Sequence, residues 1–199
     1  PRRLWQLRRP IFGWGSVQLF GSAALMAAAA VAAGLDWRLA LVARRTAEVE
    51  AWALRLGLAP ERWTVYAADV RQTDSIVAAG EACLARQGLP DVVIANAGIS
   101  IGVDTAMRSD LDAMRQTFAT NNLGMAATFH PFIDPMVSRG SGSLVGIASV
   151  AGIRGLPGHG AYCASKAAVI SYCESLRGEL KGSGVKVVTI CPGYIDTPL

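Results

Sequence analysis

Residues 143–152, SLVGIASVAG, join a short apolar run directly to a group of small residues. The run SLVGI is almost continuously apolar, whereas a strand with one face in water alternates apolar and polar residues. Continuously apolar strands are typical of parallel sheets that are covered by helices on both faces. Ala148 and Ser149 therefore fall at the carboxyl end of a buried parallel strand.

Four further apolar runs flank this stretch and alternate with longer amphipathic segments. The runs RLALV, TVYAA, DVVIA and VKVVTI predict strands at 38–42, 64–68, 91–95 and 185–190. Helices are predicted at about 46–57, 74–87, 110–138 and 159–182, with Asp74 and Asp110 as entry residues and Gly88, Gly140 and Gly182 near the exits. This alternation predicts a single α/β domain built on a doubly wound parallel sheet.

Ligands of such a sheet bind beyond the carboxyl ends of its strands. The residues that follow the five apolar runs are polar, small or turn-forming, as a ligand site requires. They are Ala43 to Arg45, Asp69 and Val70, Asn96 to Gly98, Ala148 and Ser149, and Cys191 to Gly193.

The composition of the chain argues against nucleic-acid binding and against a metal site. The net charge is +4, but it is local, because 15 basic and 15 acidic residues remain once the four arginines of residues 1–9 are set aside. The balanced remainder gives no electrostatic support for nucleic-acid binding. The four cysteines and two histidines lack metal-ligand spacing, so we expect buried free thiols and no metal site.

Tyr162 and Lys166 lie four residues apart in a predicted helix and therefore share one face. A cation that close favours phenolate over phenol, so the tyrosine can exchange a proton near neutral pH. The alternative is a solvated pair without a function. Ser149 is either a turn residue or a donor to a substrate oxygen. Asn122 is either a helix-surface residue or, through its amide or nearby backbone, a holder of water near Lys166.

Taken together, these residues resemble the classical short-chain dehydrogenase/reductase family, from about residue 38 to residue 199. The order and spacing of the motifs agree with that family. The motifs are Asn96-Ala97-Gly98, Asn122 followed by Leu123-Gly124, Ser149 within IASVAG (147–152), Tyr162 with Lys166, and PGYIDT (192–197).

The resemblance implies a Rossmann-like fold and hydride transfer between a nicotinamide cofactor and the carbonyl or alcohol carbon of a small molecule. It implies that Tyr162 is the general acid in reduction and the general base in oxidation, and that Lys166 holds the nicotinamide ribose. It also implies that Ser149 orients the carbonyl oxygen and that Asn122 supports a proton relay. The other implied cofactor contacts are Asn96, Ala97 and Gly98, then Asp69 and Val70 near adenine, then Pro192, Gly193, Ile195 and Thr197 over the nicotinamide.

In such a domain, the residues at the end of the second strand determine whether NAD or NADP binds. A carboxylate there binds the ribose 2′-hydroxyl of NAD, whereas arginine accommodates a 2′-phosphate. This chain has Arg44 and Arg45 and no acid at that point. Charge complementarity therefore favours NADP(H), unless the two arginines are only solvated residues at a helix entry.

The opening of the chain departs from the family. The resemblance implies a first strand and a loop Thr-Gly-x-x-x-Gly-x-Gly for the pyrophosphate, but only Gly21 fits within SVQLFGSA at 16–23. We expect an atypical segment at 1–22, a domain at 23–199 whose alanine-rich start is a displaced or degraded first helix, and a missing last strand after Leu199. Such a chain would bind NADP(H) poorly.

Residues 10–35 carry no charge, and their length and preceding arginines also match a membrane span or a secretion signal. Their high alanine content favours the helix of the soluble fold instead. We therefore expect a cytoplasmic oxidoreductase that forms a homodimer or homotetramer through its long helices. The alternatives are a catalytically impaired, cofactor-poor relative and a membrane-anchored enzyme.

Overall fold

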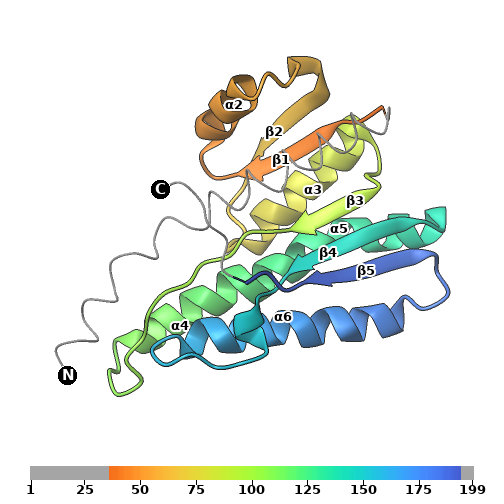
Figure 1. Ribbon diagram of the computed structural model, residues 1–199. Helices are drawn as coiled ribbons and strands as arrows, with labels where there is room; N and C mark the ends of the chain where they lie inside the picture. The colour runs from red at the N-terminus through yellow and green to blue at the C-terminus, as the bar shows by residue number, and fades with distance from the viewer. Residues whose placement is uncertain (1–35, 194–199) are drawn as a thin grey trace.

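The computed structural model describes residues 36–193 (Figure 1). The predictions for residues 1–35, which include the glycine-poor loop and the alanine-rich helix, lie outside the described residues, as do Ile195 and Thr197. The predicted α/β architecture with parallel strands is confirmed.

Five strands form the centre of the described region, and each matches its predicted range to within one residue. They are β1 (Leu39–Ala43), β2 (Trp63–Ala67), β3 (Val92–Ala95), β4 (Gly142–Ile147) and β5 (Val185–Ile190). All pairings between them are parallel: β1 pairs with β2, β3 with β4, and β4 with β5. Within each set of paired strands, the carboxyl ends therefore lie at the same edge.

Among residues 36–193 the strands form two groups, β1-β2 and β3-β4-β5, with no hydrogen-bonded pairing between β1 and β3. In a doubly wound sheet of strand order 3-2-1-4-5-6, the second and fourth strands are separated by the first. In that order β1 and β2 correspond to the second and third strands, and β3 corresponds to the fourth. The division between the two groups therefore falls between the second and the fourth strand.

Helices flank the strands: in Figure 1, α2 (Thr46–Arg55) lies above β1 and β2, whereas α3 and α5 overlap the strands in this view and α6 lies below β5. The bounds of α3, α5 and α6 are Thr73–Gln87, Gly124–Arg139 and Gly160–Glu179. The helix predicted at 110–138 is interrupted, because a π-helical segment, η3 (Ala119–Leu123), separates α4 (Asp110–Phe118) from α5. Its end is as predicted, since Gly140 caps α5 in the left-handed conformation with φ 74°.

The main core lies between α5, α6 and the group β3-β4-β5. Its fully buried members include Phe129 and Met136 from α5, Leu144 from β4, and Val169 and Cys173 from α6. A second cluster joins β2, α3 and α5, and a third joins α2 to β1 and β2. Layers packed in this way fix the strand ends relative to α6, which carries the candidate site.

Two further findings concern the described region alone. Its four cysteines are free; the prediction of buried thiols is confirmed for Cys83, Cys163 and Cys173, whereas Cys191 is only partly buried. None of the helices within residues 36–193 is long and apolar enough to cross a membrane.

Candidate functional site

The site is built where β4 and β5 end. Beyond the last paired residues of these strands, the Ala148 N–H donates to the Ile190 carbonyl at 2.8 Å, and the Val150 N–H donates to the Pro192 carbonyl at 3.0 Å. These bonds continue the β4–β5 pairing past the strand ends. They hold Ser149 beside the Pro192-Gly193 turn, so the structure brings together two of the predicted clusters.

Lys166 joins α6 to the same edge. Its side chain is buried, with 5% of the residue exposed, and its Nζ donates to the Ile147 carbonyl at the end of β4, at 2.7 Å. Burial lowers the pKa of Lys166 from 10.5 to about 8, because desolvation penalises the charged ammonium. With a pKa of about 8 the group remains about nine-tenths protonated at pH 7.

Tyr162 lies one helical turn before Lys166 and is only partly buried. The Lys166 Nζ is 5.8 Å from the centroid of the Tyr162 ring, within the range of a cation–π contact. The shared helix face that the sequence predicts is therefore present. It places a buried cation beside a phenol that remains accessible.

Ser149 reaches the same place through a short turn. Its Oγ accepts a hydrogen bond from the Ala151 N–H at 3.1 Å, at the start of the 3₁₀ turn η4 (Val150–Gly152). A Cβ on Gly152 would lie 2.7 Å from the carbonyl carbon of Lys166, so only glycine lets this turn lie directly on α6. Gly152 thus fixes the separation between Ser149 and the tyrosine–lysine pair.

The π-helical segment η3 supplies two adjacent asparagines with different surroundings. Asn121 is 2% exposed; its Oδ1 accepts from the Ile99 N–H at 2.8 Å, and its Nδ2 donates to the Ile99 carbonyl at 3.0 Å and to Ser165 Oγ at 2.8 Å. Asn122 donates instead to the Ser165 carbonyl of α6, at 2.8 Å. The structure therefore brings Asn121 to the loop after β3, and it places Asn122 against the backbone of α6.

That loop after β3 contains the predicted group Asn96 to Gly98. Gly98 faces the lysine, since a Cβ on it would lie 3.2 Å from Lys166 Nζ and 3.5 Å from Asn121 Oδ1. Asn96 is 7% exposed, and its Nδ2 is a buried donor with no partner among the described residues. The loop therefore brings the Gly98 backbone against Lys166 and contains one buried amide donor that is unused among the described residues.

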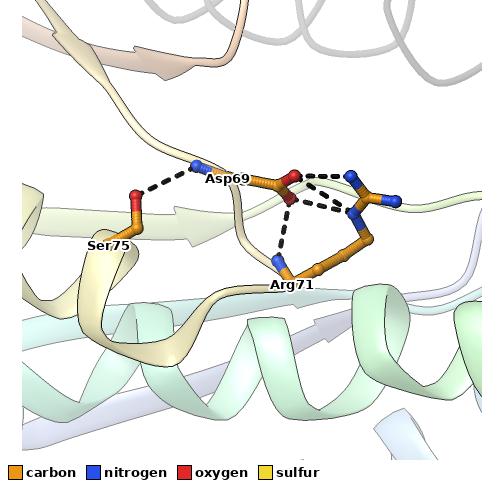
Figure 2. A network of polar contacts seen from close by, with 3 residues as sticks. All are labelled: Asp69, Arg71 and Ser75. Atoms are coloured by element: carbon orange, nitrogen blue, oxygen red, sulfur yellow. Dashed lines mark hydrogen bonds and ion pairs between the residues drawn. The ribbon is translucent and has the colours of Figure 1, made fainter.

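A second group of predicted residues lies where β1 and β2 end. Arg45 is paired with Glu48 at 3.1 Å, whereas Arg44 is exposed and close enough to Asp69 to lower the pKa of its carboxyl. Asp69 forms a forked ion pair with Arg71 (Figure 2). Val70 packs on the first residue of α5, because a Cβ on Gly124 would lie 2.8 Å from its carbonyl oxygen.

Sequence reasoning missed Asn121 and Arg71. Helical spacing offered a signal for the first, since Thr117, Asn121 and Met125 form one buried row at intervals of four residues, and Asn122 lies outside it. For Arg71 the only signal was its position two residues after Asp69.

Comparison with known proteins is consistent with this geometry. The sequence profile of the family described as short chain dehydrogenase matches residues 21–199. An uncharacterized oxidoreductase from Myxococcus xanthus is 43% identical over 131 residues, which cover 66% of this chain and 51% of that protein. The ketoacyl reductase HetN from Nostoc is 38% identical over 128 residues, which cover 64% of this chain and 44% of that protein. The chain spans about half the length of these two curated relatives.

Solved structures resemble the fold over most of the chain. A short-chain dehydrogenase from Streptomyces avermitilis matches with a TM-score of 0.79 and 33% identity, over 92% of this chain and 65% of that one. An alcohol dehydrogenase from Thermococcus sibiricus in complex with 5-hydroxy-NADP matches with a TM-score of 0.77 and 26% identity, over 89% and 73% of the two chains. A short-chain dehydrogenase/reductase from Burkholderia phymatum in complex with NAD matches with a TM-score of 0.76 and 26% identity, over 88% and 62%.

Proposed function

The chain belongs to the short-chain dehydrogenase/reductase family, and on this premise we propose that it interconverts a carbonyl and an alcohol by hydride transfer with NADP(H). Tyr162 is the general acid in reduction and the general base in oxidation. The observation that carries the proposal is the buried Lys166, which is bonded to the Ile147 carbonyl and lies 5.8 Å from the Tyr162 ring, beside Ser149.

The bound nicotinamide supplies the hydride, and the residues of this chain handle the proton and the oxygen. The hydroxyl of Tyr162 donates its proton to the carbonyl oxygen, and the Lys166 ammonium stabilises the phenolate that remains. Ser149 Oγ already accepts from the Ala151 N–H, so its own hydrogen is available to donate to the same oxygen. Two donors on one oxygen stabilise the negative charge that develops there during transfer.

The residues at the strand ends fit a nicotinamide cofactor. The Gly98 backbone lies against Lys166 Nζ, where a Cβ would come within 3.2 Å, and among the described residues a Cβ on Gly193 would meet nothing within 4 Å. The Asn96 amide and the remaining hydrogens of Lys166 Nζ are donors of the kind that ribose hydroxyls accept. Asn121 holds the loop that carries these groups, so we assign it the supporting role at this edge and leave Asn122 as a brace between η3 and α6.

Arg44 supports NADP(H) over NAD(H). It is exposed at the end of β1 and has no ion-pair partner among the described residues, whereas Arg45 is already paired with Glu48. A 2′-phosphate is a strong partner for a free guanidinium, because both groups are charged and their geometries match.

We also propose that the protein is a cytoplasmic homodimer or homotetramer. Support for assembly comes from the exposed apolar side chains along α4 and η3, where Leu111 is 60% exposed, Leu123 53% and Met114 42%. Light scattering at micromolar concentration is expected to give a multiple of the chain mass, and a strictly monomeric species would contradict the assembly.

The cofactor assignment is tested by fluorescence titration of the full chain with NADPH, up to millimolar concentration. Lys166→Met is expected to weaken binding at least about tenfold, since it removes a charge-assisted hydrogen bond to the cofactor. Lys181→Met is the matched control, because Lys181 is exposed beyond the end of α6. Equal affinities for the two variants would contradict the proposed site.

A second candidate function is a cofactor-poor relative of the same family. Val17, Leu19 and Ala23 stand where the family's loop brings backbone N–H groups close to pyrophosphate. Failure of the unmodified chain to bind at millimolar NADPH would favour this candidate. Glycines restored at 16–23 are then expected to recover part of the affinity.

A further inference from the structure

Asp69 and Arg71 form a forked ion pair in the loop between β2 and α3 (Figure 2). Arg71 Nε lies 3.1 Å from each carboxylate oxygen of Asp69, and its Nη2 lies 2.6 Å from Oδ2. The Arg71 backbone N–H adds a 3.0 Å bond to Oδ1, and the Asp69 N–H donates to Ser75 Oγ at 3.3 Å. Both oxygens of this carboxylate are therefore engaged within the loop.

The two partners differ in their exposure. The Asp69 side chain is 16% exposed, whereas the Arg71 side chain is 44% exposed. Among the described residues Arg71 Nη1 makes no hydrogen bond, so the guanidinium covers the carboxylate and still presents donors to the solvent side. The Asp69 carboxylate is therefore held inside the loop, and the Arg71 guanidinium faces the solvent.

Arg44 lies beside this loop, because Ala43 pairs with Ala67 at the ends of β1 and β2 and the Ala68 N–H donates to the Ala43 carbonyl at 3.2 Å. The pKa of the Asp69 carboxyl is lowered first by the side-chain hydrogen bond from Arg71 and further by the charge of Arg44 at the end of β1. Asp69 is therefore ionised at neutral pH. Without Arg71, it would be the nearest strong partner for Arg44 and would repel any anion that approached that arginine.

We propose that Arg71 is a specificity-determining residue for the adenosine end of the cofactor, because it neutralises Asp69 and leaves Arg44 free to bind a 2′-phosphate. The inference rests on the proposed NADP(H) function and assigns its preference to a set of three side chains. Arg44 and Arg71 bring two positive charges against the single negative charge of Asp69, so these three side chains keep a net charge of +1.

Stabilisation of the fold is a weaker explanation for the pair. Partly exposed ion pairs contribute little to stability, because water screens them and ordering long side chains costs entropy. The pair also spans only two residues of one loop, so it connects no distant elements. The effect of the pair on a neighbouring anion is the larger consequence, since Asp69 would otherwise engage Arg44 and repel the anion.

The test uses adenosine 2′-phosphate and adenosine as probes of the full chain, with binding followed by NMR. These probes contain no pyrophosphate, so the result does not depend on residues 16–23. Arg71→Leu is expected to weaken binding of adenosine 2′-phosphate at least about tenfold and to leave adenosine within about twofold. Arg86→Leu, an exposed arginine on α3, is the matched control and is expected to change neither.

The double variant Asp69→Asn/Arg71→Leu separates neutralisation from direct contact. Removing the uncompensated carboxylate is expected to recover most of the affinity for adenosine 2′-phosphate that Arg71→Leu loses. A double variant as weak as Arg71→Leu would overturn the proposal, as would equal losses for both probes or no preference of the unmodified chain for the phosphorylated probe. Failure of the proposed function itself would appear separately, as equal NADPH affinities of Lys166→Met and Lys181→Met.

Discussion

At the scale of single residues, the burial and the hydrogen bond of Lys166 give the strongest indication of the chemistry of the site. A buried ammonium, here with 5% of its residue exposed, is costly unless it is hydrogen-bonded, and among residues 36–193 its hydrogen-bond partner is the Ile147 carbonyl at 2.7 Å. Burial keeps its pKa at about 8, which leaves it charged at neutral pH but close to releasing its proton. A costly buried cation beside Tyr162 is what we expect if Lys166 stabilises the proposed phenolate.

This burial predicts a pH-dependent stability. Unfolded Lys166 keeps its proton up to its ordinary pKa of 10.5, whereas the folded form loses it above about 8. Between these values the unfolded state binds more protons, so the free energy of unfolding rises with pH. Relative to Lys166→Met, the unmodified chain is expected to gain about 2 kcal/mol between pH 7.5 and pH 10 in urea denaturation. A difference that stays constant with pH would mean that the lysine keeps its ordinary proton affinity.

At the scale of elements, the interrupted helix 110–139 is the feature that shapes the site. The π-helical segment η3 shifts the helical register for one turn, and Asn121 there binds both backbone groups of Ile99. π-helical turns are rare and occur frequently at functional sites. The segment therefore couples the loop after β3 to Ser165 on α6.

The two neighbouring asparagines predict different losses. Asn121→Ala removes three hydrogen bonds from a buried position and is expected to cost about 2–3 kcal/mol of unfolding free energy. Asn122→Ala, the matched control, removes one bond and is expected to cost about 1 kcal/mol. Equal losses in urea denaturation would contradict the assignment of the supporting role to Asn121.

The strands and the ends of the helices could be predicted from the sequence because they have local causes. Examples are the apolar run at 143–147 and the left-handed Gly140. The tyrosine–lysine face could also be predicted, since it needs only helical spacing. The π-helical turn could not, because it exists through contacts with Ile99 and Ser165, which lie far away in the sequence. The burial of Asn121 could have been predicted from its spacing with Thr117 and Met125, but its bonds to Ile99 and Ser165 could not. The Asp69–Arg71 pair depends on a loop conformation that no periodicity encodes.

At the scale of the whole molecule, we expect the two groups of strands to bind different ends of the proposed cofactor. The ends of β1 and β2 carry Arg44 and the Asp69–Arg71 pair, and the ends of β3, β4 and β5 carry Gly98, Ser149 and Pro192 around Lys166. A dinucleotide has a charged adenosine end and a reactive nicotinamide end, so one ligand could span both groups. We therefore expect the preference between NADPH and NADH to depend on the ends of β1 and β2, and hydride transfer to depend on the ends of β3, β4 and β5.

Cofactor preference tests this division. Arg44→Asp replaces an attractive charge with a repulsive one and adds an acceptor for a 2′-hydroxyl, so the preference is expected to reverse from NADPH toward NADH. Arg45→Asp is the matched control and is expected to have the smaller effect, since Arg45 is paired with Glu48. Equal affinities of the unmodified chain for NADPH and NADH would refute the assignment.

The proton donor is the most direct test of the central claim. The unmodified chain, at saturating NADPH deuterated at the transferred position of C4, is given a panel of carbonyl probes that includes 3-oxoacyl thioesters. The account predicts deuterium on the carbinol carbon of a product alcohol, and at least about a hundredfold lower rate for Tyr162→Phe with NADPH affinity unchanged. Tyr172→Phe, a change on the same helix, is expected to keep the full rate. Turnover retained by Tyr162→Phe, or no deuterated alcohol from any probe while NADPH binds, would contradict the account.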